Sequence, residues 1–380
     1  MTNELIDMHN RITTEELDHL VRHQLKQIFG HPEEAKKLPP LMIWGAPGIG
    51  KSSIIRHIAE ELGIGFIDVR LAQREPVDIR GLPVPDQDSV KWLVSADWPR
   101  DPQSRGIILF DELTAADRSL QVAAYEFILD RRLGGLYQVP DGWYICAAGN
   151  RVEDSAVAMT MSSSLANRFL HVELREDAEL WAQWGLHHNI HPAVLGFIRY
   201  RPDLLFHVDN ENLERGWPTP RSWERVSSML HSFGRDDDVL LNKAIYGLVG
   251  NQAGVEFCAF REISAEFDNV YELMTNPSKK ITIPEKPDQR YAFCAAVVYH
   301  LWRGTDESVE KKLLDGFYRI ALKLPSDFAT LMMMDAMSGN AETVTPVFAD
   351  KLFRHPKYKE WADRHGKAMR ARLNRKAILQ

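Results

Sequence analysis

The segment from Gly45 to Ser52 constrains the fold of this chain more than any other part of the sequence. It reads Gly-Ala-Pro-Gly-Ile-Gly-Lys-Ser, which is the G-x-x-x-x-G-K-S pattern of a phosphate-binding P-loop. An apolar run at 41–44 precedes it and a segment with helical periodicity, 53–62, follows it. This is the strand–loop–helix context that the motif requires, so the sequence predicts an α/β nucleotide-binding core.

Each part of the loop has an expected role in binding a nucleotide. Glycines allow backbone N–H groups to turn towards phosphate oxygens, and the following helix N-terminus adds partial positive charge. Lys51 is expected to reach the β- and γ-phosphates, and Ser52 is expected to bind Mg²⁺. We therefore predict ATP and Mg²⁺ as cofactors, with the nucleotide bound by Gly45, Ala46, Pro47, Gly48, Ile49, Gly50, Lys51, Ser52 and Ser53.

The composition is that of an ordinary globular protein, with 44% hydrophobic and 26% charged residues. No apolar stretch approaches the ~20 residues of a membrane span, and the acidic N-terminus lacks the features of a signal peptide. Three widely spaced cysteines indicate neither a disulfide framework nor a metal site. We expect a cytoplasmic protein. Its net charge of −7 argues against bulk nucleic-acid binding, although a local basic channel stays open.

The first half of the chain alternates between strand and helix patterns. A leading helix is predicted at 13–29, where Thr13 and Glu16 have capping-box spacing. Further strands are predicted at 65–70, 106–110 and 143–148, with a helix at 115–129, a hairpin near 134–142 and an irregular segment at 73–99. Alternation of this kind is typical of parallel βαβ units.

Helical periodicity dominates after about residue 175, with helices predicted at 221–232, 238–250 and 288–302. We therefore divide the chain into an N-terminal helix, an α/β core, a helical lid and a further helical region. Their predicted bounds are 1–34, 35–175, 176–265 and 266–380.

Two acids, Asp111 and Glu112, follow the apolar strand that ends at Phe110. In a P-loop enzyme the Asp at this strand end holds Mg²⁺, and a neighbouring Glu can act as general base for the attacking water. Asp111 is thus a predicted metal and nucleotide ligand, and Glu112 a predicted catalytic residue. The alternative is an acid pair at a helix N-terminus that complements the helix dipole.

Three further polar residues are candidates for catalysis. Asn150 ends the next strand, where a ligand crevice is expected, and it could orient water or touch the γ-phosphate. The alternative for Asn150 is a turn residue after glycine. Arg168 and Arg221 carry a guanidinium that matches phosphate oxygens, and the alternative for each is a surface salt bridge.

In their order and spacing, these motifs resemble those of the AAA+ ATPases, most of all the MoxR branch and the dynein- and midasin-related ATPases. The resemblance covers about residues 35–260 and implies that Asn150 is sensor 1, Arg168 the arginine finger and Arg221 sensor 2. The segment 78–81 resembles the start of the family's insert, which projects from the core and can contact substrate. Asn167 stands where the MoxR pattern often has Asp, and Arg151 after the sensor is unusual.

The same resemblance implies a ring, usually a hexamer, that remodels or matures a partner protein as a chaperone does. MoxR-like ATPases commonly work with proteins that contain a von Willebrand factor A domain. The alternatives are a nucleic-acid-stimulated NTPase or restriction-type motor subunit, and a scaffold that binds ATP without turning it over.

Two other groups of residues carry weaker signals. His187, His188 and His191 cluster on a predicted helix, but no further ligand lies at metal-binding spacing, so we predict a structural or surface role. Trp92 and Trp98 lie in the predicted insert, where they could contact a substrate or belong to the core.

Overall fold

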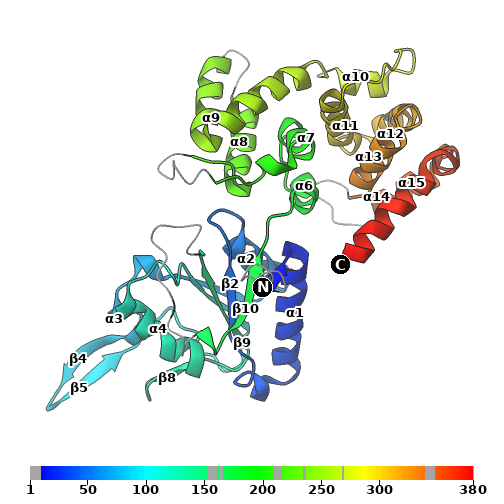
Figure 1. The fold of residues 1–380 in the computed structure, drawn as a ribbon. Helices are drawn as coiled ribbons and strands as arrows, with labels where there is room; N and C mark the ends of the chain where they lie inside the picture. Colours follow the sequence, from blue (N-terminus) through cyan, green and yellow to red (C-terminus); the bar gives the residue numbers. More distant parts are fainter. Residues whose placement is uncertain are drawn as a thin grey trace, which may run out of the picture. The chain divides into compact units, whose positions relative to one another are not determined.

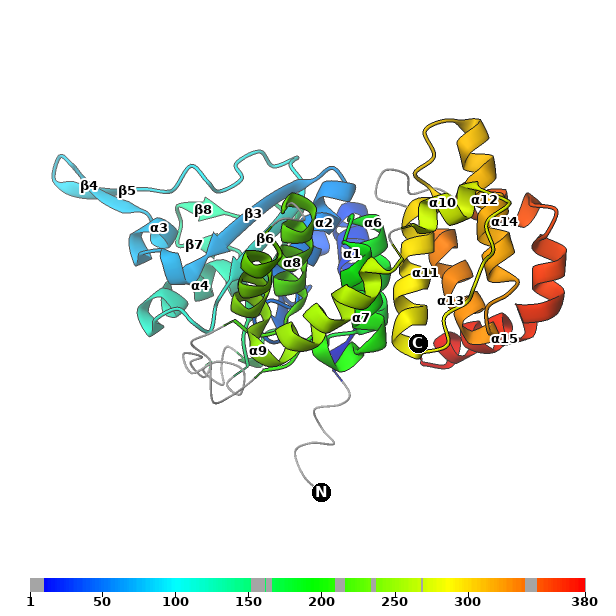
Figure 2. The ribbon, with the colours of Figure 1, turned by 90° about the horizontal axis from the view of Figure 1, so that it is seen from above.

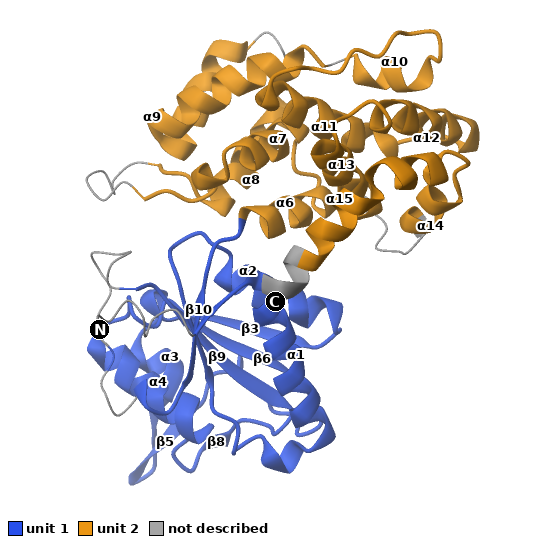
Figure 3. Ribbon diagram, turned by 45° about the vertical axis from the view of Figure 1, so that its right-hand side comes forward, with its two compact units in different colours: residues 1–177 blue, residues 178–380 orange. Residues whose placement is uncertain are grey.

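A computed structural model describes residues 10–151, 161, 166–208, 216–233, 237–267, 269–338 and 347–379. The chain forms two compact units, one up to Asp177 and one from Ala178 onwards (Figure 3).

The first unit is built around a six-stranded parallel sheet with the order β1-β10-β2-β9-β6-β3 (Figure 1). The strands are β1 (Arg11–Ile12), β2 (Leu41–Trp44), β3 (Gly65–Arg70), β6 (Gly106–Asp111), β9 (Trp143–Gly149) and β10 (Leu170–Leu174). Strands β2, β6 and β9 form the middle of the sheet and are apolar almost throughout, as expected for strands that are buried on both faces. The predicted fold class, an α/β P-loop core followed by helical regions, is confirmed.

Helices cover both faces of this sheet. Figure 1 shows α1 (Thr14–Gly30) on one side and α4 (Arg118–Asp130) on the other. The predicted capping box starts α1, because Glu16 N donates to Thr13 Oγ1 at 3.2 Å and Thr13 N donates to Glu16 Oε2 at 2.6 Å. The helix that follows the P-loop, α2 (Lys51–Glu61), packs beside α1.

The segment predicted to be irregular, 73–99, is partly regular, so that prediction is wrong for much of its length. It contains α3 (Pro76–Arg80) and a hairpin of β4 (Leu82–Asp86) and β5 (Ser89–Leu93). Pro83 and Pro85 made a strand at β4 unexpected, because proline argues against a strand unless the strand lies at an edge. Figures 1 and 2 both show this hairpin extending away from the sheet.

The two tryptophans of this segment have different environments. The Trp98 ring is 3% exposed and lies 4.4 Å from the Phe127 ring, so it belongs to the core beneath α4. Trp92 is 40% exposed on the hairpin. Only Trp92 stays available for contact with another molecule.

A smaller hairpin, β7 (Arg132–Leu133) and β8 (Tyr137–Gln138), follows α4. Its turn contains Gly134 and Gly135, which were predicted to flank the hairpin.

The second unit is helical, and the predicted helices at 221–232, 238–250 and 288–302 are confirmed within it. Figure 2 shows α11 and α13 side by side in this unit. Its helices are α6 (Ala178–His187), α7 (Pro192–Tyr200), α8 (Pro220–Ser232), α9 (Asp238–Ala265), α10 (Val270–Thr275), α11 (Pro287–Leu301), α12 (Glu307–Ala321), α13 (Ser326–Ser338), α14 (Val347–Arg354) and α15 (Tyr358–Leu379). The predicted lid and C-terminal region both lie in this unit, and the boundary between them stays a prediction. None of the helices in the described ranges is long and apolar enough to cross a bilayer.

One buried ion pair joins α7 to α13 inside the second unit. Arg199 Nη2 donates to Asp335 Oδ1 at 2.7 Å, Nη1 donates to Oδ2, and the two side chains are 6% and 9% exposed. Burial raises the pKa of Asp335 to about 6, although Arg199 opposes the shift. The pair is therefore a place where removing one partner leaves a charge without compensation.

We expect Arg199→Met to destabilise the chain by about 3–5 kcal/mol, because the Asp335 carboxylate would stay buried without its cation. Because burial raises the pKa of Asp335 in the folded state, the folded state loses stability as pH rises through that pKa. Arg199 opposes this shift, so the destabilisation by Arg199→Met should be larger at pH 8 than at pH 5. Urea unfolding of the second unit, followed by circular dichroism, measures it. The double variant Arg199→Met/Asp335→Leu is the control, and it should regain most of the lost stability. A single variant as stable as wild type would contradict the prediction.

Candidate nucleotide-binding site

The P-loop runs from the end of β2 into the start of α2 with the backbone that the motif requires. Gly48 has φ +83° and Gly50 has φ +101°, a region that glycine enters without steric cost. Gly50 is the N-cap of α2, so the helix begins at Lys51. The loop therefore leads directly into a helix N-terminus, where the first N–H groups have no acceptor within the helix, and such an end can bind anions.

Lys51 connects the loop to the neighbouring strand. Lys51 is 7% exposed. Its Nζ donates to Gly45 O at 2.7 Å, to Ala46 O at 2.9 Å and to Asn150 Oδ1 at 3.0 Å. Parallel pairing of β2 with β9 places the carboxyl ends of the two strands side by side. The structure thus brings Lys51 and Asn150 together as predicted.

Ser52 and Asp111 form a second contact across the site. Ser52 Oγ donates to Asp111 Oδ2 at 2.5 Å, although β9 separates β2 from β6 in the sheet. Two adjacent oxygen donors fit Mg²⁺, which takes one or two protein ligands and completes its octahedron with phosphates and water. Within the described residues no three His, Cys, Asp or Glu side chains gather as a metal site.

Glu112 has a strained backbone at the end of β6. Its φ is +57°, which is rare for a residue with a side chain, and its N–H donates to Asp111 Oδ1 at 2.9 Å. The carboxylate accepts no hydrogen bond from any described residue. Because α4 begins only at Arg118, with Asp117 as its N-cap, the alternative of a helix N-terminal acid pair is excluded.

Thr114 is a positioning residue that sequence reasoning missed. It is 2% exposed and binds the main chain of Asn150. Its Oγ1 accepts from Asn150 N at 3.1 Å and donates to Asn150 O at 3.3 Å. Gly149 makes this contact possible, since a Cβ there would lie 2.8 Å from Thr114 Cγ2. The signal in the sequence was a threonine two positions after the acid pair.

We expect Thr114→Val to lower the ATP hydrolysis rate about tenfold while ATP binding changes little. The substitution keeps the shape of the side chain and removes the hydroxyl that fixes Asn150. Steady-state hydrolysis and nucleotide titration measure the two effects separately. Thr114→Ser retains the hydroxyl and should restore the rate. Equal loss in both variants would show that packing of the methyl group, and not the hydrogen bond, matters.

Arg168 lies on the surface of the first unit, in the turn that precedes β10. Its side chain is exposed, and no hydrogen bond or ion pair holds it within the part of the chain that the structure describes. The alternative of a surface salt bridge is therefore not found among those residues. Leu165, at the start of the same motif, lies outside the described residues.

Arg151, the residue after Asn150 that is unusual for the MoxR pattern, forms an ion pair. Its Nη1 donates to Glu173 Oε1 at 2.5 Å, and Arg11 Nε lies 3.1 Å from the same oxygen.

Arg221 lies in the second unit, in the first turn of α8. Thr219 and Ser222 form a capping box around it, and its side chain is exposed. Burial raises the pKa of Glu224, whereas the charges of Arg221 and Arg225 act to lower it. The predicted role of Arg221 towards nucleotide stays a prediction.

The three histidines have different environments, and His188 is exposed. His187 ends α6, whereas His191 is the N-cap of α7 and its Nδ1 accepts from Ala193 N at 3.2 Å. Burial lowers the pKa of His191 to about 4, so its ring is neutral at physiological pH.

Comparisons with known proteins agree with this geometry. Residues 41–169 match the family model described as ATPase family associated with various cellular activities (AAA). Midasin from Giardia intestinalis is 26% identical over 170 residues, which is 42% of this chain and 4% of the midasin sequence. The chain therefore spans only a small part of that relative.

Solved structures give distant likenesses. A point mutant of RuvB from Thermotoga maritima is 15% identical, with a TM-score of 0.33 over 68% of this chain and 79% of RuvB. NtrX from Brucella abortus, solved with ADP, is 16% identical, with a TM-score of 0.28 over 84% of this chain and 62% of NtrX. Scores this low do not establish a shared fold. The similarity to a known family rests on the match over residues 41–169 and on the geometry of the site. Over residues 41–169, this chain is thus similar to the AAA family of ATPases.

Proposed function

We propose that this protein is a Mg²⁺-dependent, MoxR-like AAA+ ATPase that works as a ring and uses hydrolysis to remodel a partner protein. One observation carries the catalytic part of this proposal. Three segments far apart in sequence meet at the carboxyl edge of one sheet, because Lys51 donates a hydrogen bond to Asn150 and the adjacent Ser52 donates one to Asp111.

The binding roles follow from the contacts. Phosphate oxygens would replace the carbonyl groups that now accept hydrogen bonds from Lys51 Nζ. Ser52 and Asp111 would hold Mg²⁺, with Asp111 acting through water. When bound, the metal neutralises the negative charge that develops on the β- and γ-phosphates.

The catalytic roles fall to the strand ends. The Glu112 carboxylate is half-buried and accepts no hydrogen bond from the described residues, so it can accept a proton from an attacking water. Asn150 would orient that water through its side-chain amide, which Thr114 fixes through the main chain.

The exposed guanidinium of Arg168 supports the ring. A cation that has no described partner on its own subunit can approach the nucleotide of a neighbour and stabilise charge in the transition state. In this reading Arg221 reports the nucleotide state to the lid, as a hinge that closes around ligand.

The partner is proposed from resemblance to the MoxR branch, in which proteins with a von Willebrand factor A domain are common clients. A Glu112→Gln variant that traps ATP would serve as bait for such a protein in cells.

We expect ATP hydrolysis per subunit to rise with protein concentration and to follow ring assembly, because each site needs Arg168 from a neighbour. Hydrolysis assays and mass photometry on the same samples measure both quantities. Added DNA or RNA tests the alternative, since a nucleic-acid motor would be stimulated in a salt-dependent way. Activity that does not change with concentration would contradict the ring.

A further inference from the structure

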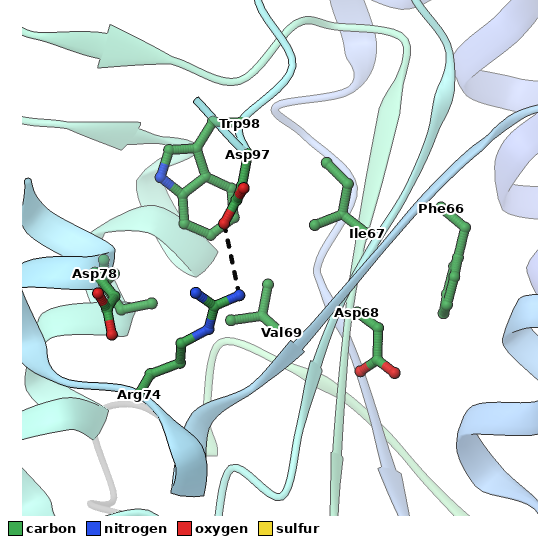
Figure 4. Close-up of a pocket in the computed structure, with 9 residues that line it drawn as sticks. Phe66, Ile67, Asp68, Val69, Arg74, Asp78, Asp97 and Trp98 are labelled. Atoms are coloured by element: carbon green, nitrogen blue, oxygen red, sulfur yellow. Dashed lines mark ion pairs between the residues drawn. The ribbon is translucent and has the colours of Figure 1, made fainter. Parts of the chain in front are cut away.

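The first unit contains a cavity that the nucleotide site does not use. Its volume is about 320 Å³, and its walls come from β3, from the α3 segment and from the loop after β5 (Figure 4). Four consecutive residues of β3, 66–69, line it.

This lining shows that the cavity lies along the outer edge of β3. Successive residues of a strand point to opposite faces. In Figure 4, Ile67 and Val69 extend to one side of the strand and Phe66 and Asp68 to the other. A cavity that touches all four must pass around the backbone between them. β3 is the last strand of the sheet, so one of its edges has no neighbouring strand.

The backbone at this edge is open. Gly65 N donates to Arg105 O at 2.9 Å, towards β6. Because the direction of backbone groups alternates along a strand, the N–H and C=O groups of Phe66 and Asp68 point away from β6. No hydrogen-bond partner for these groups occurs within the described ranges. Such an edge is a template on which an extended peptide can add as a further strand.

The hairpin beside it offers a useful contrast. β4 pairs only with β5, and it carries Pro83 and Pro85, which have no N–H to give to a further strand. The prolines therefore restrict strand addition at β4, whereas β3 carries no proline.

Two residues that line the cavity each have a buried polar atom with no hydrogen-bond partner among the described residues. These atoms are Asp68 Oδ1 and Trp98 Nε1, and Trp98 as a whole is 3% exposed. An unsatisfied buried acceptor or donor costs about 1–3 kcal/mol, which a ligand with both kinds of group would recover. An extended peptide carries both.

The charges favour a basic side chain. Three carboxylates, those of Asp68, Asp78 and Asp97, line the cavity, against the single guanidinium of Arg74. The other oxygen of Asp68, Oδ2, is engaged by Arg56 at 3.0 Å and Arg70 at 3.6 Å.

Arg74 is the one lining arginine that remains for the two carboxylates of Asp78 and Asp97. Its Nη2 lies 3.5 Å from Asp97 Oδ2. One oxygen of Asp78 accepts from Glu75 N at 2.9 Å. We propose that an extended segment of a partner protein adds to β3 as a strand and places a lysine or arginine side chain between Asp78 and Asp97.

Peptide binding to the full chain tests this proposal without nucleotide, so its result is independent of the ATPase. The probes are two fluorescein-labelled peptides, Thr-Val-Thr-Lys-Thr-Val-Thr and the same sequence with Glu in place of Lys. Fluorescence anisotropy should show binding of the lysine peptide at least tenfold tighter than of the glutamate peptide. Equal affinities would overturn the choice of a basic side chain.

Charge reversal at the rim gives a matched pair of variants. The Asp97 side chain is 56% exposed, so Asp97→Lys should fold and weaken the lysine peptide at least tenfold. Asp88→Lys reverses a charge that is also exposed, in the hairpin turn and outside the cavity, and should leave binding unchanged. Equal effects of the two variants would mean that the peptide responds only to net charge.

Hydrogen exchange reads the edge itself. The amides of Phe66 and Asp68 should exchange quickly in the free protein and more slowly with the lysine peptide. Asp68→Pro removes one outward N–H without touching the ladder to β6, and it should reduce the affinity at least tenfold. Binding that survives Asp68→Pro would overturn strand addition. Protection of both amides without peptide, growing with protein concentration, would show that a second copy of the chain occupies the edge instead.

Discussion

Glu112→Gln is expected to bind ATP with near wild-type affinity and to hydrolyse it about 100- to 10,000-fold more slowly. The amide has the size of the carboxylate but cannot accept a proton from water. Because no described residue donates a hydrogen bond to the Glu112 side chain, the substitution removes no contact that supports the fold.

Single-turnover hydrolysis, together with titration of a fluorescent ATP analogue, separates the loss of chemistry from the loss of binding. Glu60→Gln is the matched control, since Glu60 is exposed on α2, and it should leave both quantities unchanged. A Glu112→Gln enzyme with a wild-type rate would remove Glu112 from catalysis and would favour a site that binds nucleotide without this mechanism.

Arg168→Ala is expected to reduce hydrolysis by about 1,000- to 100,000-fold while ATP binding persists. The guanidinium is exposed and without a described partner, so its removal should not affect the stability of the subunit. Arg175, another exposed arginine of the same unit, provides the control, and Arg175→Ala should keep the wild-type rate.

Mixing two inactive variants tests whether Arg168 acts on a neighbour. A subunit with Glu112→Gln still offers Arg168, and a subunit with Arg168→Ala still offers Glu112. Their mixture should therefore regain activity, because some interfaces combine both intact residues. A mixture that stays as inactive as its components would place Arg168 and Glu112 in the same subunit's site, or would remove Arg168 from catalysis.

The sequence predicted those parts of the site that depend on local pattern. The P-loop is contiguous, and the acids after β6 and the amide after β9 follow apolar runs whose parallel pairing brings their ends together. The fold class followed from the same alternation of strands and helices. Local pattern was also sufficient for α1, where the spacing of Thr13 and Glu16 marks the start of the helix.

What the sequence did not predict depends on contacts between distant segments. The strand β1 has two residues and exists because it pairs with β10, more than 150 positions later. Thr114 gains its role only when β6 and β9 lie side by side, which places its hydroxyl against Asn150. The hairpin at 82–93 was missed because its prolines contradict the usual composition of a strand.

The positive φ of Glu112 has an energetic consequence for the whole domain. A backbone held in this region by a residue with a side chain stores on the order of 1–3 kcal/mol, against a total domain stability of about 5–15 kcal/mol. Contacts of the adjoining turn have to offset that cost. In one of them, Leu113 N donates to Ala148 O at 2.9 Å. The strained main chain at Glu112 therefore sets the direction of its carboxylate. The same strain lowers the stability of the domain.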